Sequence, residues 1–270
     1  MDSNTIINQI PILTLEQLSY SYHTLSGETK ALENISFKIF PGEFVAIVGP
    51  SGCGKSTLLN IIAGQITDYT GNIKFHDTPM RILQSHSADL HIGYMLQHDH
   101  LFDWRTIYKN VCLGLEIKNL MTDENIDYVL SLLEKYGLYD FKDKKPSQLS
   151  GGMRQRAALI RTLALNPELL LLDEPFSALD YQTRLQVSGD IGNIIRENKK
   201  TAILVTHNLS EAISLADKII VLTQRPATIK RIVDISLTIT DNSPLGYRTA
   251  PEFNEYFNEI WEDLCDENKK

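Results

Sequence analysis

The sequence predicts an α/β fold, and three observations support this fold class. The apolar run 44–48 is followed by a glycine-rich turn and by the breaker-free stretch 57–63, as in a buried strand that turns into a buried helix. The continuous apolar runs 169–172 and 202–205 are typical of strands buried on both faces. Elsewhere charged residues lie between apolar ones, which favours helices. We therefore expect an α/β core interrupted by a mostly helical insert near residues 98–162.

The N-terminal part of this core is expected to be rich in strands. Residues 12–48 alternate between apolar and polar types around turn residues. The segment 35–40 has the period of a strand, and a Pro-Gly turn follows it. Residues 24–30 are expected to form a polar loop, and residues 72–76 another strand.

The rest of the chain continues the alternation of helices and strands. Helices are expected at 110–119, at 123–136 and after Leu149, and the run 219–222 is expected to be a further buried strand.

The C-terminal extension, residues 241–270, is expected to form an amphipathic helix. Thr249 and Glu252 have the spacing of a capping box, and Pro251 suits a first helical turn. Apolar residues then fall on one side: Phe253, Tyr256, Phe257, Ile260, Trp261 and Leu264. Packing on the chain's own domain is the favoured interpretation, and docking of a regulator or partner is the alternative.

Composition limits the classes of function. The net charge of -8 argues against a nucleic-acid binder, which usually has a basic face. Three widely spaced cysteines fit a reducing compartment and not a disulfide framework. The N-terminus lacks the positive region of a signal peptide, and no apolar run approaches the roughly 18 residues that span a bilayer. We expect a cytoplasmic, soluble chain that reaches a membrane only through a partner.

The glycine-rich turn predicts a polyphosphate site. It has the spacing G-x-x-x-x-G-K-S, in which bare glycine amides and the positive end of the following helix face one point. A chance glycine turn is the structural alternative. The residues expected to bind are Gly49, Pro50, Ser51, Gly52, Cys53, Gly54, Lys55, Ser56 and Thr57. Cys53 is interpreted as a small filler in preference to a redox sensor.

Two acids end the apolar strand 169–172. Asp173 can hold Mg²⁺ through its water shell beside the hydroxyl of Ser56, and Glu174 can accept a proton from an attacking water. A solvated strand exit is the alternative for two such acids, but it rarely occurs together with an upstream phosphate loop.

A second phosphate-ready helix start follows Leu149. Ser150, Gly151 and Gly152 precede an amphipathic helix, so bare amides again lie at a positive dipole end. One nucleotide loop and two such helix starts are best explained if the second faces a nucleotide bound to another subunit. A merely flexible glycine turn is the alternative.

Six motifs in order resemble the ATP-binding subunit of ABC transporters. They are "GPSGCGKST", "GYMLQ", "LSGGM", "LLLLDEP", "SALD" and "VTHNLSEA". The resemblance covers about residues 12–240 and implies a P-loop NTPase core, an N-terminal antiparallel β subdomain and an inserted helical subdomain. Many members carry Gln where this chain has Met153; Met occurs there in importers for nitrate, sulfonates and taurine, which the chain resembles also in its tail.

The resemblance implies a role for each motif residue. Lys55 would neutralise the β- and γ-phosphates, and Thr57 and the amides of Gly52 and Gly54 would bind α- and β-oxygens. Metal ligands would be Ser56, Gln97 and Asp173. Catalytic residues would be Glu174 as general base, His207 at the γ-phosphate and Gln97 at the metal or water. Ser150, Gly151 and Gly152 would reach ATP on the opposite subunit. Tyr22 would lie under adenine, with Tyr20 as the rival.

The implied protein is an ATPase that dimerises head to tail around two Mg-ATP and drives a membrane permease. It would lie on the inner face of the membrane, receive its solute from an extracytoplasmic binding protein, and bind no nucleic acid. The alternatives are an ABC transporter with another cargo, a soluble ABC protein of translation or DNA repair, and a P-loop kinase or GTPase. The last would not explain "LSGGM", and the chain lacks an N-K-x-D signature.

The segment 98–106, "HDHLFDWRT", is expected to dock the permease, because it follows Gln97 and carries aromatic residues beside charges. The alternative is that Leu101, Phe102 and Trp104 fill the core of the helical insert. Nearby histidines suggest a metal site, but their spacing matches no ligand pattern and an exposed polar stretch is the preferred interpretation. They are His86, His91, His98 and His100.

Overall fold

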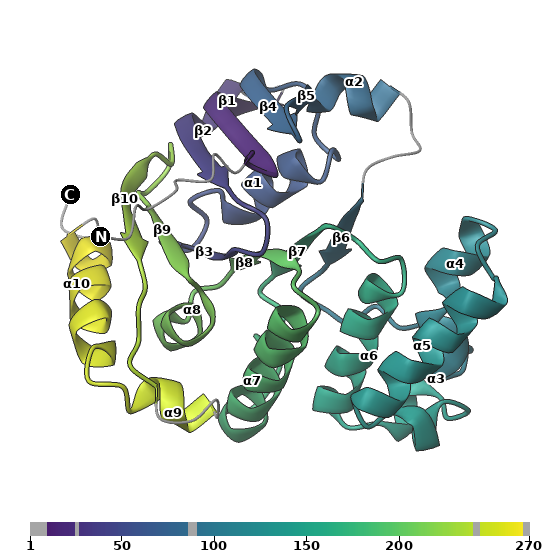
Figure 1. Cartoon of the computed structure of the whole chain (residues 1–270). Helices are drawn as coiled ribbons and strands as arrows, with labels where there is room; N and C mark the ends of the chain where they lie inside the picture. Colours follow the sequence, from purple (N-terminus) through teal and green to yellow (C-terminus); the bar gives the residue numbers. More distant parts are fainter. Residues whose placement is uncertain (1–9, 25–26, 86–90, 240–243, 267–270) are drawn as a thin grey trace, which may run out of the picture.

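The computed structural model describes residues 10–24, 27–85, 91–239 and 244–266 (Figure 1). Within these residues the strands form two sheets. The first has four strands in the order β2-β1-β4-β5, and the second has six in the order β10-β9-β3-β8-β7-β6. A group of helices, α3 to α6, lies beyond the β6 end of the larger sheet (Figure 1).

The smaller sheet is antiparallel. Its strands are β1 (Leu13–Thr24), β2 (Gly27–Ile39), β4 (Thr70–Phe75) and β5 (Thr78–Pro79). The expected polar loop at 24–30 is wrong, because Thr24 pairs with Gly27 and the hairpin continues to that point. The first residues of β2 are exposed, so their polarity reflects solvent on both faces and not a break in the strand.

The larger sheet is parallel except at one edge. Its parallel strands are β3 (Phe44–Val48), β6 (Ile92–Met95), β7 (Leu169–Asp173), β8 (Thr201–Val205) and β9 (Lys218–Leu222). Strand β10 (Ile229–Asp234) pairs antiparallel with β9. Every residue of β3, β7 and β8 is buried, which confirms that the continuous apolar runs are strands covered on both faces.

Two hydrophobic clusters cover the two faces of the larger sheet. Val45 and Ile47 point to the side shared with the smaller sheet and with helix α1 (Lys55–Ile62). Phe44 and Ala46 point to the opposite side, where helices pack. These helices are α6 (Gly151–Leu163), α7 (Tyr181–Glu197), α8 (Leu209–Leu215) and α10 (Phe253–Asp266). The sheet therefore presents the carboxyl ends of its parallel strands between two packed layers.

The middle of the chain is helical, as the charge pattern indicated. It contains α3 (Ile107–Val111), α4 (Leu113–Ile117) and α5 (Asp123–Lys135), followed by the 3₁₀ turns η1 (Tyr139–Phe141) and η2 (Pro146–Gln148). The helix expected at 110–119 is two short helices that meet at Cys112, and the first begins at Ile107. A further short helix, α2 (Met80–Ser85), follows β5.

The C-terminal residues form α9 (Pro244–Arg248) and α10. Phe253 and Ile260 of α10 are buried against the core, whereas Trp261 is 54% exposed. The expected capping box is wrong: the Glu252 carboxylate accepts hydrogen bonds from the amide and hydroxyl of Thr238, and the Thr249 hydroxyl donates to the Gly246 carbonyl. Within the described part of the chain, no helix combines the length and apolarity that a membrane span needs.

Candidate active site

The glycine-rich turn joins β3 to α1, and its backbone requires glycine. Gly54 has φ +127°, and a Cβ there would lie 3.0 Å from Leu32 Cδ2 and 3.2 Å from the Ala31 carbonyl oxygen. Lys55 is buried, and its Nζ donates to the carbonyl oxygens of Gly49 at 2.8 Å and Pro50 at 2.9 Å. The lysine therefore lies folded over the loop, with its charge held by two of the loop's carbonyl oxygens.

Ser56 and Asp173 meet at the carboxyl end of β7. The Ser56 hydroxyl donates to Asp173 Oδ1 at 3.0 Å, and the Asp173 side chain is largely buried. Burial raises the pKa of Asp173, and the hydrogen bond from Ser56 only partly opposes this shift. The cost of burying the Asp173 carboxylate is thus only partly offset. A divalent cation, which prefers oxygen ligands, could bind this carboxylate together with the Ser56 hydroxyl.

Tyr94 completes this corner and was missed in the sequence. Its hydroxyl donates to Asn60 Oδ1 at 2.8 Å and lies 3.5 Å from Asp173 Oδ2. Burial, together with the charge of Asp173, raises the pKa of Tyr94 well above its usual value, so the phenol stays neutral and remains a donor. The available signal was its position in "GYMLQ", on β6 beside β7.

Glu174 and His207 lie at the ends of the neighbouring strands β7 and β8. The Nδ1 atom of His207 is 3.0 Å from Glu174 Oε2. Glu174 has φ +45°, an uncommon backbone conformation for a residue other than glycine, and its amide donates to the Val205 carbonyl oxygen at 2.9 Å. Both side chains remain solvent-accessible. Strain of this kind is concentrated at functional sites, where surrounding contacts hold it in place.

Gln97 reaches the Glu174 side of the site. Its Nε2 donates to the Ser177 hydroxyl oxygen at 3.3 Å, and that hydroxyl donates to the Glu174 carbonyl oxygen at 3.0 Å. The structure thus brings Gln97 to the segment that follows Glu174, and its predicted contact with a metal stays a prediction.

The helix start at Ser150 packs on α7 of the same chain. Ser150 is the N-cap of α6, and its hydroxyl oxygen accepts from the Met153 amide at 3.3 Å. A Cβ on Gly152 would lie 2.7 Å from Val187 Cγ2, and one on Gly151 would lie 3.0 Å from Leu179 Cδ2. Close packing is therefore a second reason for these glycines, which the sequence did not reveal, and their approach to a nucleotide on another subunit stays a prediction.

The two tyrosines of β1 have different surroundings. The Tyr22 hydroxyl is 2.8 Å from Thr57 Oγ1, at the start of α1, and its ring is exposed. Tyr20 is only partly exposed and packs against the core cluster, with its ring in an edge contact with Tyr22. Tyr22 is therefore the ring available beside the glycine-rich turn.

A second missed residue, Arg225, lies over the glycine-rich turn. Its Nη2 donates to the Gly52 carbonyl oxygen at 2.7 Å. Both line an open cavity of about 590 Å³, together with Pro50, Ser51, Cys53 and Gln224. No motif marks Arg225, because it follows β9 and reaches the turn only through the fold. Cys53 is 1% exposed and burial raises the pKa of its thiol, which favours the filler interpretation.

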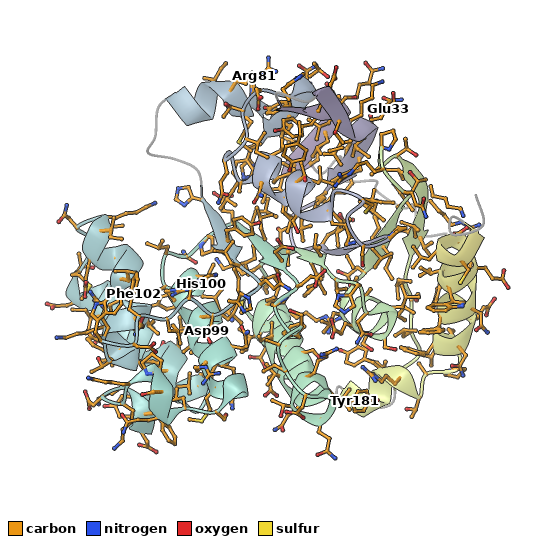
Figure 2. All side chains as sticks on the ribbon, turned by 180° about the vertical axis from the view of Figure 1, so that it is seen from behind. Glu33, Arg81, Asp99, His100, Phe102 and Tyr181 are labelled. Carbon is orange, nitrogen blue, oxygen red and sulfur yellow. The ribbon has the colours of Figure 1, made fainter. Side chains whose placement is uncertain are left out.

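The segment 98–106 forms an ordered loop on the helical part of the molecule. Asn110 is fully buried and holds the loop: its amide nitrogen donates to the carbonyl oxygens of Phe102, Arg105 and Thr106, and its oxygen accepts from the Phe102 amide. Asp99 accepts from Arg154 Nε at 3.1 Å, which ties the loop to α6. In Figure 2 the labelled Asp99 and Phe102 lie together on this side.

The loop divides its apolar residues between the core and the surface. Leu101 is 8% exposed and belongs to the core, whereas Trp104 is 73% exposed and its ring lies 4.7 Å from that of Phe102. The interpretation that these three side chains fill the core of the insert is therefore correct for Leu101 and wrong for Trp104, while Phe102 is half-buried between them.

The histidines do not form an evident metal centre. His98 and His100 are exposed and make an edge contact with ring centroids 5.9 Å apart. His91 is also exposed, and His86 lies outside the described residues. Among the residues with described positions, no group of three or more His, Cys, Asp or Glu side chains could hold a metal ion.

Comparison with known protein families gives a direct match. The sequence pattern of the family described as "ABC transporter" matches residues 32–177. An uncharacterized ABC transporter ATP-binding protein, YtlC of Bacillus subtilis (strain 168), is 43% identical over 93% of this chain and 95% of its own length. The nitrate import ATP-binding protein NrtD of Synechocystis sp. (strain PCC 6803) is 39% identical over 87% of this chain and 88% of its own.

Two further similar proteins are an importer subunit and a cassette of known structure. The taurine import ATP-binding protein TauB of Ruegeria pomeroyi is 38% identical over 81% of this chain and 80% of its own length. A dimeric structure of the ATP-binding cassette MJ0796 with ADP and Pi superposes with a TM-score of 0.70 at 32% identity, over 83% of this chain and 99% of that one. The predicted α/β cassette fold is thereby confirmed.

Proposed function

The chain belongs to the ABC transporter family of ATP-hydrolysing, transport-coupled ATPases, and on this basis we propose that it powers an importer for a small solute of the nitrate, sulfonate or taurine type. The observation that supports hydrolysis most directly is the Glu174–His207 pair, because Glu174 directly follows Asp173, the partner of Ser56, at the end of β7. A proton acceptor and a proposed cation site therefore lie side by side at this strand end.

The glycine-rich turn is proposed to bind the phosphates of ATP. The amides of Gly52 and Gly54 and the hydroxyl of Thr57 would bind α- and β-oxygens, while Lys55 would turn from the carbonyls of its own loop toward the β- and γ-phosphates. Tyr22 would lie under the adenine ring, since its ring is accessible and its hydroxyl is held at Thr57.

The residues at the end of β7 fit Mg²⁺. This ion prefers oxygen ligands and usually keeps several waters, so one carboxylate, one hydroxyl and the phosphates suffice. Ser56 and Asp173 offer that pair at 3.0 Å from each other, and Gln97 is proposed to join them. When bound, the ion would neutralise charge on the β- and γ-oxygens.

Glu174 is proposed to act as the general base. Its carboxylate would take a proton from a water that attacks the γ-phosphate, and His207 would donate a hydrogen bond to that phosphate. The carboxylate lies 3.0 Å from Nδ1 of His207, and the backbone at Glu174 is left-handed, with φ +45°. Positioned groups of this kind supply most of the catalysis in phosphoryl transfer.

A head-to-tail dimer is proposed to complete each site. In it Ser150, Gly151 and Gly152 would reach the γ-phosphate of ATP bound to the other subunit. The N-terminus of α6 offers amides at a positive dipole end, and the Ser150 hydroxyl oxygen accepts from Met153, which leaves its own proton free to donate. The dimeric cassette with ADP and Pi supports this arrangement.

The segment 98–106 is proposed to dock a membrane permease. Trp104 offers exposed aromatic surface, with the half-buried Phe102 beside it, on a loop fixed by Asn110 that follows Gln97 directly. A preorganised aromatic pair of this kind is a common anchor at interfaces. The permease would place the chain on the inner face of the membrane and receive solute from an extracytoplasmic binding protein.

The substitution Glu174→Gln tests the catalytic proposal. It should keep ATP binding and nearly abolish hydrolysis, because the base acts only in the chemical step. ATP should then trap a stable dimer, measured by size-exclusion chromatography with ATP present. Glu168→Gln, an exposed acid before β7, is the matched control and should hydrolyse ATP at the parent rate. Hydrolysis by Glu174→Gln near the parent rate would show that the base is assigned wrongly.

The cargo requires a separate experiment. The whole complex of ATPase, permease and binding protein should be reconstituted in liposomes, and its ATPase rate measured with nitrate, taurine or an alkanesulfonate. Stimulation by one of these and not by uncharged solutes of similar size supports the proposed class. Stimulation by an unrelated solute alone would establish an ABC transporter with a different cargo.

A further inference from the structure

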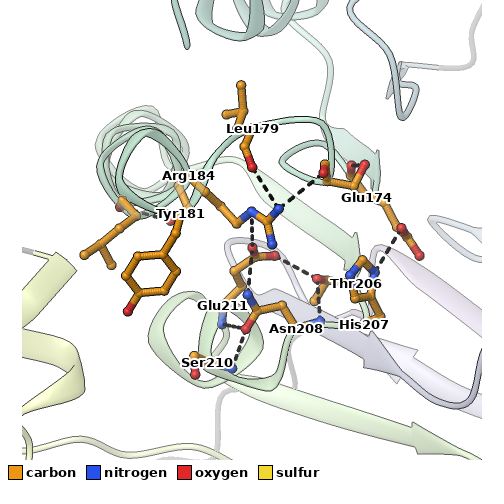
Figure 3. A network of polar contacts seen from close by, with 12 residues as sticks. Glu174, Leu179, Tyr181, Arg184, Thr206, His207, Asn208, Ser210 and Glu211 are labelled. Carbon is orange, nitrogen blue, oxygen red and sulfur yellow. Dashed lines mark hydrogen bonds and ion pairs between the residues drawn. The ribbon is translucent and has the colours of Figure 1, made fainter. Parts of the chain in front are cut away.

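We propose that Arg184 and Glu211 are positioning residues that join the segment after Glu174 to the segment carrying His207. The inference rests on the proposed function and adds two residues to it. Neither residue lies in the glycine-rich turn, in the acid pair or at the start of α6. Both lie in a network of polar contacts between α7, α8 and the two strand ends (Figure 3).

Glu211 holds the segment that carries His207. Its side chain is 4% exposed. The Thr206 hydroxyl donates to Glu211 Oε2 at 2.7 Å, and the Asn208 amide nitrogen donates to Oε1 at 3.2 Å. These donors are the residues on either side of His207. The Glu211 carboxylate therefore fixes the backbone from which the histidine projects toward Glu174.

Arg184 holds the segment that follows Glu174. Its Nη2 donates to the carbonyl oxygens of Ser177 at 3.2 Å and Leu179 at 2.8 Å. Ser177 in turn accepts from Gln97 and donates to the Glu174 carbonyl oxygen. The guanidinium thus fixes the segment 177–179, which lies between Glu174, the proposed general base, and helix α7.

An ion pair between Arg184 and Glu211 joins these two sets of contacts. Arg184 Nε lies 3.9 Å from Glu211 Oε1, and this Nε is buried without a hydrogen-bond partner in the described structure. Burial raises the pKa of Glu211, and the hydrogen bond from Thr206 and the charge of Arg184 oppose that shift. Such buried ion pairs add little net stability, since desolvation offsets their attraction, and an arrangement of this kind is better explained by the geometry it specifies.

The link also reaches the start of α6. Leu179, whose carbonyl Arg184 holds, packs against Gly151, with the Leu179 methyl 3.0 Å from where a Cβ of that glycine would lie. Through Leu179, the Arg184–Glu211 pair is thus connected to the surface that the proposed dimer presents to the other nucleotide.

The main test replaces the pair with apolar residues of similar length, Arg184→Met with Glu211→Met, in the full chain. A buried ion pair can be replaced in this way with little loss of stability, whereas a single replacement leaves one buried charge unpaired. We expect the double variant to fold with a lower melting temperature, because the Thr206 hydroxyl and the Leu179 carbonyl lose their partners, and to bind a fluorescent ATP analogue within twofold of the parent, but with a kcat at least tenfold lower. A merely structural pair would leave kcat unchanged in a folded protein.

Two further variants make the result decisive. Glu211→Gln keeps an acceptor for Thr206 but removes the charge facing Arg184, and we expect a lower kcat with unchanged ATP affinity. Glu197 lies on α7, as Arg184 does, and forms an exposed ion pair with Lys135 of α5. The substitution Glu197→Gln removes this pair and should change neither kcat nor ATP affinity.

The outcomes separate this inference from the proposed function. Parent-like kcat in the folded double variant, or in Glu211→Gln if the double variant fails to fold, overturns the role of the pair and leaves the ATPase assignment intact. A parent chain that binds ATP but never hydrolyses it, even with its permease, overturns both.

Discussion

The substitution Trp104→Ala separates the two roles that an aromatic residue in the segment 98–106 could have. The residue is 73% exposed, so about a quarter of its surface is buried, and its ring lies beside that of Phe102. A tryptophan presents up to about 250 Å², so truncation exposes roughly 65 Å² of buried surface, worth about 1.5 kcal/mol at most at 25 cal/mol per Å². The isolated chain should therefore fold and bind ATP.

Leu101→Ala is the matched control from the same loop. Leu101 is 8% exposed and lies in the core, so its truncation should cost about 2–5 kcal/mol. Chemical denaturation of the isolated chain measures both losses. Co-purification with the permease and solute uptake measure docking, which Trp104→Ala should abolish.

The docking proposal fails on either of two results. A loss of stability for Trp104→Ala as large as that for Leu101→Ala would show that the ring supports the insert and not a partner. Normal co-purification and uptake by a stable Trp104→Ala chain would show that the exposed ring contributes nothing to the permease contact.

Three other predictions concern the active site. The variants Ser150→Arg and Lys55→Ala should each be nearly inactive. Their mixture should recover partial ATPase activity, because one of the two composite sites in the heterodimer is intact. If heterodimers form but no activity is recovered, the result counts against independent shared sites. Gly152→Ala should cost about 1–3 kcal/mol by overpacking, since its Cβ would lie 2.7 Å from Val187 Cγ2, and Val187→Ala should restore the melting temperature without restoring hydrolysis. Asp173→Asn should raise the melting temperature of the nucleotide-free chain, because it removes a buried charge, while weakening Mg-ATP binding. Because burial raises the pKa of Asp173 above its unfolded value, ionisation costs stability at neutral pH, so the advantage of the Asn variant should be constant well above the raised pKa and be lost as the pH falls through it toward the unfolded value; an advantage that persists below the unfolded pKa would contradict this cause.

Much of the fold and of the candidate site follows from local sequence patterns. The runs that become β3, β7 and β8 are apolar throughout because both of their faces are covered, and this burial is visible without knowing what covers them. The glycine-rich turn is equally local, because the backbone at Gly54 admits hardly any other residue. Sequence order also placed Glu174 and His207 at strand ends, where parallel strands bring them together.

Other features depend on contacts between distant parts of the chain. The hairpin strand at 27–30 looks like a loop because it is exposed, and only its pairing with β1 makes it a strand. The exposure of Trp104 and the burial of Leu101 depend on how the loop lies on the insert, which Asn110 decides by binding its carbonyls. Polarity alone does not distinguish these environments.

The tertiary structure alone decided which side chains support the site. Arg225 reaches Gly52 across 173 residues of sequence, and Tyr94 reaches Asp173 across 79. Arg184 and Glu211 meet only because α7 and α8 pack on the same face of the sheet. Arg225 and Arg184 lie in none of the motifs, and although Tyr94 and Glu211 lie within "GYMLQ" and "VTHNLSEA", the motifs do not say which side chains they support, because only packing between elements brings those partners close.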